Sequence, residues 1–353
     1  MDSQVNRMQT ILFLSHTEAD QSLGRAGLEA LGAAASLQAS LPGSQLVVGL
    51  FGEGAQIAAN QVGGCGATRF LGVTGPDFSQ SRYATDAAAV EALSRAASPD
   101  IVIAPATSRI NRVLPGVAER VGGRADTHIV GVAVIDGAVQ ASRWYYRQRM
   151  EAQIKRSQLP WFLAIDPGSQ PSWGGAPAPA AVEAVPVTLP DSCKRTRVTG
   201  MRTPAADAQT IRPDANLLLV AGAGWTKKQA DGQPHVKEAE ELILGCLKQA
   251  RASLGSSKSL VDLGGEGQAV LGFLTHLNQV GQTGSTPRHQ KGLATCCHGE
   301  EPHAVGWRFI NERRAINLDA GCGWARGKAD VLYVADAFAV LRKVNELLAQ
   351  SPG

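Results

Sequence analysis

One stretch of the chain combines glycines with carboxamide and hydroxyl side chains. Residues 279–284 read Gln-Val-Gly-Gln-Thr-Gly. The glycines allow backbone amides to approach an anion, while Gln282 and Thr283 can supply side-chain hydrogen bonds. This chemistry suits a nucleotide-type ligand. Polar glycine-containing loops are also ordinary turns, so the residue types alone leave both interpretations open.

Two further glycine-containing turns could contribute to a ligand site. Residues 220–224, Val-Ala-Gly-Ala-Gly, end an apolar run, and open α/β sheets bind ligands where a strand ends. These glycines do not complete the three-glycine dinucleotide fingerprint, so a tight strand-to-helix turn is an equal interpretation. Residues 255–258, Gly-Ser-Ser-Lys, add hydroxyls and an ammonium group that suit a phosphate, although alone they are typical of a surface turn.

The cysteines and histidines do not indicate a metal centre. No two of the six cysteines form a Cys-X-X-Cys pair. Cys296 and Cys297, with His298 and His303 nearby, are the nearest approach to a ligand set, but adjacent cysteines fit structural zinc poorly. We therefore expect no metal site and no iron–sulfur cluster, and reduced thiols in a cytoplasmic protein. We also find no Ser–His–Asp or paired-carboxylate signature, and predict no catalytic residue.

Composition places the chain among ordinary globular proteins. Of 353 residues, 44% are hydrophobic and 18% are charged, and the net charge is +3. These values exclude a disordered chain and give no basis for nucleic-acid binding. No apolar run is long enough to be a transmembrane segment, and we see no secretory signal. The length indicates two domains.

Strand-like and helix-like segments alternate along both halves of the chain, which predicts mostly parallel sheets flanked by helices. The predicted strands are 11–14, 45–51, 100–104, 128–134, 215–220, 315–318 and 331–335. The predicted helices are 22–37, 84–97, 112–121, 237–252 and 338–348, with 269–277 helical or irregular.

A segment with six prolines, residues 166–190, separates the two halves. It cannot form a regular element, and we predict a linker or surface excursion with a short strand-like stretch around 184–189. The expected organisation is an α/β domain of residues 1–166, a Pro/Ala-rich linker of residues 167–205, and a doubly wound, Rossmann-like α/β domain of residues 206–353.

Together these motifs resemble the alpha subunit of the electron transfer flavoproteins. Residues 279–284 are identical to the FAD-binding loop of that family. His303 follows Gly284 by nineteen residues and Asn317 follows His303 by fourteen, both as in the family, and Asp330 matches an acidic residue after one extra position. The resemblance extends to 104–108 and 143–146 in the first half, and to 220–224 and 255–258 in the second.

The resemblance implies a divergent alpha-type subunit that forms a heterodimer with a beta-type subunit and binds FAD. Such a protein carries electrons from a flavin-dependent dehydrogenase or demethylase to a downstream acceptor, and is not a stand-alone catalyst. The implied FAD-binding residues are Gly224, Ser257, Lys258, Gln279, Gln282, Thr283, Gly284, His298, Gly299, His303, Asn317 and Asp330. Among them, Asn317 and Asp330 would bind the adenosine end and His303 would lie near the flavin ring or ribityl chain.

The chain departs from the family at several of these positions. Gly224 and Lys258 replace arginines, His298 replaces a serine, and Pro302 replaces a glutamine that contacts flavin. These changes motivate a second hypothesis, a redox-silent structural subunit of a larger oxidoreductase assembly with an eroded flavin site. A nucleotide-hydrolysing enzyme is a third, but the chain has no Walker lysine or metal-ligand cluster.

Overall fold

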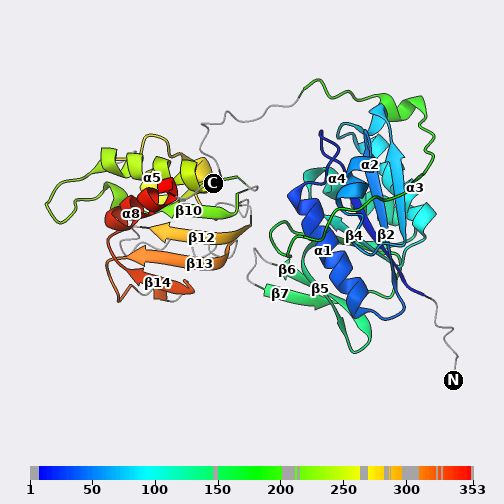
Figure 1. Cartoon of the computed structure of the whole chain (residues 1–353), viewed down its shortest axis with the longest axis horizontal. Coiled ribbons are helices and arrows are strands. Elements are labelled where there is room, and N and C mark those ends of the chain that lie inside the picture. The colour runs from blue at the N-terminus through cyan, green and yellow to red at the C-terminus, as the bar shows by residue number, and fades with distance from the viewer. Residues whose placement is uncertain are drawn as a thin grey trace. The chain divides into compact units, whose positions relative to one another are not determined.

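The structure is a computed structural model that describes residues 8–145, 150–200, 211–212, 215–262, 269–281, 286, 288–295, 310–322, 325–326 and 329–350. The chain divides into two compact units, Met1–Arg202 and Thr203–Gly353, called here the first and second domains. Each has a mostly parallel sheet flanked by helices (Figure 1), so the predicted two-domain α/β fold is confirmed.

The first domain has a nine-stranded sheet in the order β7-β6-β5-β8-β4-β1-β2-β3-β9. Neighbouring strands are parallel, except that β6 runs antiparallel to both β5 and β7. The strands are β1 (Thr10–His16), β2 (Gln45–Gly52), β3 (Arg69–Thr74), β4 (Ile101–Pro105), β5 (Arg124–Ile135), β6 (Ala138–Tyr145), β7 (Met150–Ile154), β8 (Trp161–Ile165) and β9 (Val182–Ala184).

Helices cover both faces of this sheet. Successive side chains of a strand point to opposite sides, so the apolar side chains of a buried strand pack against helices on both faces. In β1, Ile11 and Phe13 join one buried cluster with residues of α1, whereas Leu12 and Leu14 join a second cluster with residues of α3 and α4. The helices are α1 (Arg25–Ser40), α2 (Gln56–Gln61), α3 (Tyr83–Ala97) and α4 (Ser108–Arg120), with short 3-10 turns at Pro76–Phe78 and Asp191–Lys194.

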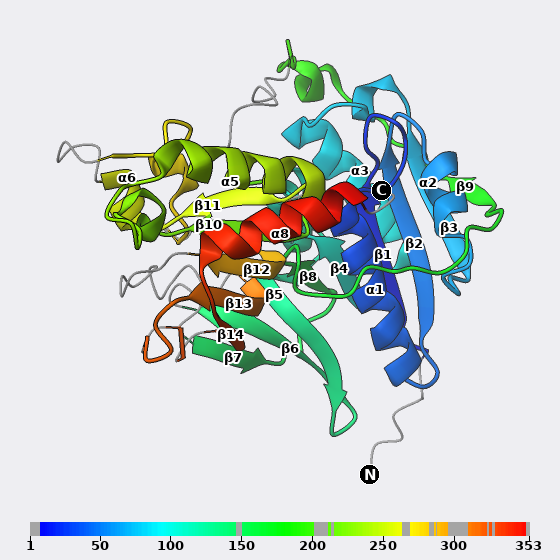
Figure 2. The same ribbon diagram turned by 60° about the vertical axis from the view of Figure 1, so that its left-hand side comes forward.

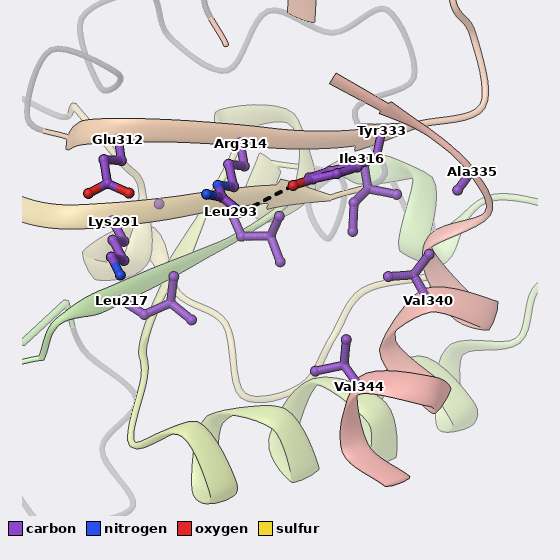
Figure 3. Close-up of a pocket in the computed structure, with 11 residues that line it drawn as sticks. Leu217, Lys291, Leu293, Glu312, Arg314, Ile316, Tyr333, Ala335, Val340 and Val344 are labelled. Carbon is purple, nitrogen blue, oxygen red and sulfur yellow. Dashed lines mark hydrogen bonds between the residues drawn. The ribbon is translucent and has the colours of Figure 1, made fainter. Parts of the chain in front are cut away.

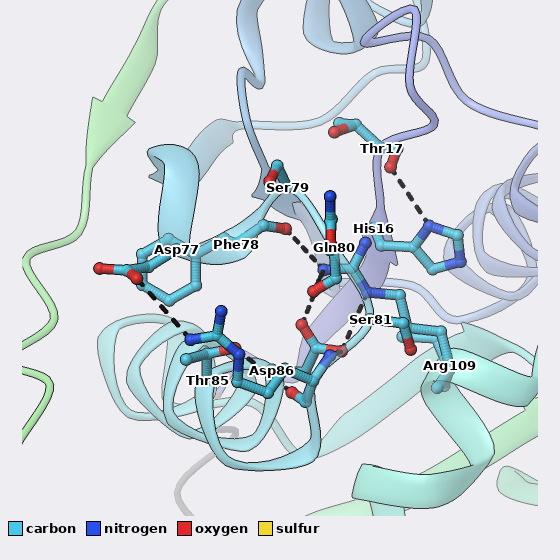
Figure 4. A network of polar contacts seen from close by, with 12 residues as sticks. His16, Thr17, Asp77, Phe78, Ser79, Gln80, Ser81, Thr85, Asp86 and Arg109 are labelled. Atoms are coloured by element: carbon cyan, nitrogen blue, oxygen red, sulfur yellow. Dashed lines mark hydrogen bonds and ion pairs between the residues drawn. The ribbon is translucent and has the colours of Figure 1, made fainter. Parts of the chain in front are cut away.

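The carboxyl edge of the first sheet contains a buried ion pair (Figure 4). Arg109 of α4 donates to both carboxylate oxygens of Asp86 in α3, through Nε at 2.9 Å and Nη2 at 2.7 Å. Burial raises the pKa of Asp86, against the hydrogen bonds and charge of Arg109. Burial, together with the charge of Arg109, lowers the pKa of His16 at the end of β1. The imidazole is therefore neutral near pH 7.

The proline-rich segment, residues 167–190 and called here the strap, lies along the first domain (Figure 2). The amide of Trp173 donates to the carbonyl of Leu28 at 2.9 Å, and that of Ala178 donates to the carbonyl of Asn60 at 3.0 Å. Further on, β9 pairs with β3. The sequence predicted a linker or a surface excursion for this segment. In the structure, hydrogen bonds join the strap to the helices that it crosses.

The second domain has a five-stranded, all-parallel sheet in the order β11-β10-β12-β13-β14. The first strand along the chain, β10, has β11 on one side and β12 on the other. This reversal makes a topological switch point, where open α/β sheets bind ligands at the carboxyl ends of their strands. The strands are β10 (Leu217–Ala221), β11 (Ser253–Ser256), β12 (His289–Thr295), β13 (Ile310–Asn317) and β14 (Val331–Val334).

Two helices, α5 (Val236–Ala250) and α8 (Ala337–Gln350), pack on one another over one face of this sheet. Shorter elements are α6 (Lys258–Asp262) and the 3-10 turns Ala223–Thr226 and His276–Asn278. The sequence did not predict β11 or β12. In the parts of the chain that the structure describes, no helix is both long and apolar enough to span a bilayer.

Candidate functional site

Several of the predicted residues lie at the carboxyl edge of the second sheet. Gly224 lies in the turn after β10, Ser257 and Lys258 follow β11, and Asn317 is the last residue of β13. All the strands are parallel, so their carboxyl ends share one edge of the sheet. The sequence placed these residues up to 93 positions apart, and the topology brings them to a common edge.

Backbone and side-chain hydrogen bonds hold the turn after β10 in place. The amide of Gly222 donates to the carbonyl of Thr295 at the end of β12, at 2.9 Å. Gly224 is buried, and its carbonyl accepts from the amide of Lys227 at 3.3 Å and from Nε2 of Gln229 at 3.0 Å. Gly224 therefore contributes to the shape of the edge through its backbone.

The side chain of Trp225 stabilises the same turn. Its indole Nε1 donates to the Thr295 hydroxyl at 2.8 Å, and its ring lies 4.6 Å from the ring of Phe338 between centroids. The Thr295 hydroxyl donates to the carbonyl of Val220 at 3.1 Å. Sequence reasoning missed this support, because Trp225 and Thr295 are separated by seventy residues.

The first half of the loop 279–284 runs beside the end of β11. Gln279 forms a parallel bridge with Ser256, and the amide of Val280 donates to the Ser256 carbonyl at 3.0 Å. Gly281 has a φ of +84°, a conformation that favours glycine. Its amide donates to the Thr286 hydroxyl at 2.6 Å, so this contact brings Gly281 and Thr286 together.

Six of the predicted residues lie outside the described residues: Gln282, Thr283, Gly284, His298, Gly299 and His303. The cysteines at 296 and 297 and Pro302 do so as well. Among the residues that the structure does describe, no group of three or more His, Cys, Asp or Glu side chains could hold a metal ion.

Hydroxyl groups are concentrated where β11 ends. The Ser257 hydroxyl accepts from the amide of Leu260 at 3.3 Å, and its own amide donates to the carbonyl of Ala221 at 2.9 Å. The Ser256 side chain is fully buried, and its Oγ has no hydrogen-bond partner in the described structure. Leaving such a group unpaired costs about 1–3 kcal/mol, so Ser256 Oγ is a position where a ligand could supply the missing bond. Lys258 is half-exposed and lies 3.8 Å from Asp262.

The structure does not bring Asp330 together with Asn317. Asp330 precedes β14, at the amino edge of the sheet, where its carboxylate accepts from the backbone amide of Arg313 at 2.6 Å and from Nη2 of Arg313 at 2.9 Å. These hydrogen bonds lower the pKa of Asp330. Asn317 lies at the opposite edge, buried, with Oδ1 accepting from the amide of Asp319 at 3.0 Å.

The carboxylate that follows β14 at the carboxyl edge is Asp336. It caps α8 by accepting from the amides of Phe338 at 3.1 Å and Ala339 at 3.4 Å, and the preceding amide, of Ala335, donates to the carbonyl of Asn317 at 3.2 Å. Sequence reasoning did not select Asp336. The available signal was its position between a predicted strand and a predicted helix, where open sheets bind ligands.

Comparison with known proteins gives a match over the first domain. The family model of the electron transfer flavoprotein domain matches residues 11–190, just over half of the 353 residues. The match begins in β1 and ends with the strap. No curated protein gives a significant match to the chain.

Proposed function

The chain belongs to the electron transfer flavoprotein family, and we propose that it is an alpha-type subunit that binds FAD together with a beta-type subunit. In this role it carries electrons from a flavin-dependent dehydrogenase or demethylase to a downstream acceptor. The observation that carries the proposal is the carboxyl edge of the second sheet, where Gln279–Gly281 runs beside the unpaired hydroxyl of Ser256. The cytoplasmic location stays a prediction.

The described residues at this edge fit the polar chain of FAD. The hydroxyls of Ser256 and Ser257, the carboxamides of Gln279 and Asn317 and the ammonium group of Lys258 are the groups that a ribityl chain, a pyrophosphate and a ribose require. FAD, when bound, supplies the redox chemistry. We propose that the remaining contacts come from Gln282, Thr283, Gly284, His298, Gly299 and His303.

Asp336 replaces Asp330 in this proposal as the carboxylate nearest the adenosine end. A carboxylate suits ribose hydroxyls because it accepts two hydrogen bonds. Asp336 lies at the same edge as Asn317, whereas Asp330 lies at the other edge and pairs with Arg313. The role that the resemblance implied for an acidic residue is therefore better filled by Asp336.

Co-expression with the beta-type subunit tests the proposal. The purified complex should contain one FAD per heterodimer, and its visible absorption should bleach when a reducing partner is added. A colourless complex, or bound flavin that never changes redox state, would instead favour the redox-silent structural subunit.

Paired variants test the residues. Thr283→Ala combined with Asn317→Ala should lower the FAD content of the complex. Asp336→Asn should also lower it, because asparagine keeps the helix cap but loses the charge. Asp330→Asn is the matched control and should leave FAD content unchanged. Full FAD content in Asp336→Asn would remove Asp336 from the site.

A further inference from the structure

A groove of about 490 Å³ opens between α8 and the sheet of the second domain (Figure 3). Its floor is apolar and comes from three strands and one helix. The floor residues are Leu217 of β10, Leu293 of β12, Ile316 of β13, and Val340 and Val344 of α8. This volume is within the range of small-molecule sites in proteins.

The groove exists because α8 is held against α5. The side-chain amide of Asn345 donates to the carbonyl of Leu242 at 3.0 Å, and Arg342 forms an ion pair with Glu238. On the side that faces the sheet, α8 presents the short side chains Val340 and Val344. These side chains do not fill the space over β13 and β14, where Tyr333 remains 42% exposed.

Charged groups are confined to the strands at the side of the groove away from Val340 and Val344 (Figure 3). Arg314 is oriented by a hydrogen bond of 3.1 Å from its Nη1 to the hydroxyl of Tyr333. Lys291 and Glu312 are neighbours in the register of β12 and β13. Two cations face one carboxylate here, so this end attracts an anion while the floor excludes charge.

We propose that this groove binds a small amphipathic carboxylate, with its apolar chain on the valines of α8 and its carboxylate toward Arg314 and Lys291. An apolar floor with a few convergent polar groups is the usual composition of a ligand pocket. The polar end lies on one face of the sheet, at Lys291 of β12 and at Glu312 and Arg314 of β13, three or more residues before the carboxyl ends of these strands where the candidate FAD residues lie. The proposal therefore does not depend on FAD binding.

Titration of the full chain with octanoate, followed by calorimetry and by the methyl NMR signals of valine, tests the proposal. We expect saturable binding that shifts the signals of Val340 and Val344. Val344→Trp should fill the groove and weaken octanoate binding at least tenfold. Leu347→Trp is the matched control, since this residue of α8 is exposed and does not line the groove; it should bind octanoate like the unmodified chain.

The charge of the ligand is tested by Arg314→Gln combined with Lys291→Gln. Each exposed ion pair contributes up to about 1 kcal/mol, which is about fivefold in affinity. Loss of both cations should therefore weaken octanoate binding by about fivefold to thirtyfold, while binding of the uncharged 1-octanol should not change. If Val344→Trp does not fold, Val340→Leu repeats the test of filling the groove with a smaller increase in side-chain volume.

Three outcomes would overturn the proposal. The first is the absence of saturable octanoate binding up to millimolar concentration. The second is equal weakening of octanol and octanoate binding in the glutamine variant, which would remove the carboxylate from the recognition. The third is a failure of octanoate to bind while Val344→Trp blocks association with the beta-type subunit, which would assign the groove to a protein interface.

Discussion

The indole of Trp225 donates a hydrogen bond of 2.8 Å to the hydroxyl of Thr295. Both side chains are fully buried, and the same hydroxyl donates to the carbonyl of Val220 at 3.1 Å. The contact joins the turn after β10 to the last residue of β12, the adjacent strand at the switch point of the sheet. It therefore fixes the two strand ends beside which the candidate FAD residues lie.

Trp225→Phe should destabilise the second domain and lower its retention of FAD. Phenylalanine keeps an aromatic ring against Phe338 but loses the donor to Thr295. A hydrogen bond of this kind contributes about 0.5–1.5 kcal/mol, and some packing is lost as well. Urea unfolding of Trp225→Phe, Thr295→Val and the double variant measures the coupling between the two side chains. Strictly additive losses would mean that the hydrogen bond does not stabilise the fold.

The position of the strap against α2 should depend on the absence of a side chain at Gly63. A Cβ at this position would collide with the backbone carbonyl oxygen of Ala178. Gly63→Ala should therefore displace the strap, at a cost of about 1–3 kcal/mol, and should expose it to proteases.

Gly174→Ala is the matched control for the strap. No heavy atom lies within 4 Å of the position its Cβ would take, and its φ is not in the left-handed region. Thermal unfolding and limited proteolysis should therefore be unchanged or slightly more resistant in this variant. Equal sensitivity of Gly63→Ala and Gly174→Ala would show that the close contact with Ala178 is not needed.

Elements with a strong hydrophobic period were predictable from the sequence. The predicted helices 84–97 and 338–348 correspond to α3 and α8, and the predicted strand 11–14 lies within β1. In contrast, β12 has the sequence His-Gln-Lys-Gly-Leu-Ala-Thr, which shows neither alternation nor an apolar run. It is a strand because β10 and β13 pair with it on both sides, and such tertiary pairing leaves little local signal.

The sequence could indicate local motifs of the candidate site, but not at which edge of the sheet each residue lies. The segment Gln279–Gly281 lies at the edge that the motif indicated. Asp330 and Asp336 are only six residues apart, yet they lie at opposite ends of β14. Position along the chain does not tell at which end of a short strand a residue lies. The resemblance selected Asp330 by matching it to an acidic residue of the family, without regard to the strand end.

Because of Asp126, the first domain should lose stability at acidic pH. Burial would raise its pKa, but the hydrogen bonds from Arg156 and Trp161, with the charges of Arg156 and Arg143, outweigh this and lower the pKa. A carboxyl whose pKa is lower in the folded protein stabilises the fold above its ordinary pKa of about 3.9. That contribution is lost as the pH falls through the lower, folded value.

Asp126→Asn should therefore be less stable than the unmodified chain by about 1–3 kcal/mol near pH 7, and the two should converge as the pH falls below about 4. Asp136→Asn is the matched control, because Asp136 is exposed in a turn with φ of +52°, a conformation that asparagine adopts readily. Urea unfolding across this pH range makes the comparison. A constant difference at every pH would mean that the ionisation of Asp126 does not contribute.

Ser256→Ala should separate stability from FAD binding at the carboxyl edge. The Ser256 hydroxyl is buried without a partner in the described structure, so its removal should leave the flavin-free chain unchanged or more stable by up to about 1 kcal/mol. FAD retention should fall if the cofactor supplies the missing bond.

Ser253, at the other end of β11, provides the control, because its hydroxyl accepts from the amide of Arg212 at 2.7 Å. Ser253→Ala should give the opposite result, with lower stability and unchanged affinity for FAD. Urea unfolding without flavin and fluorescence titration with FAD measure the two effects, and a stability loss in Ser256→Ala with full FAD affinity would place the cofactor away from this hydroxyl.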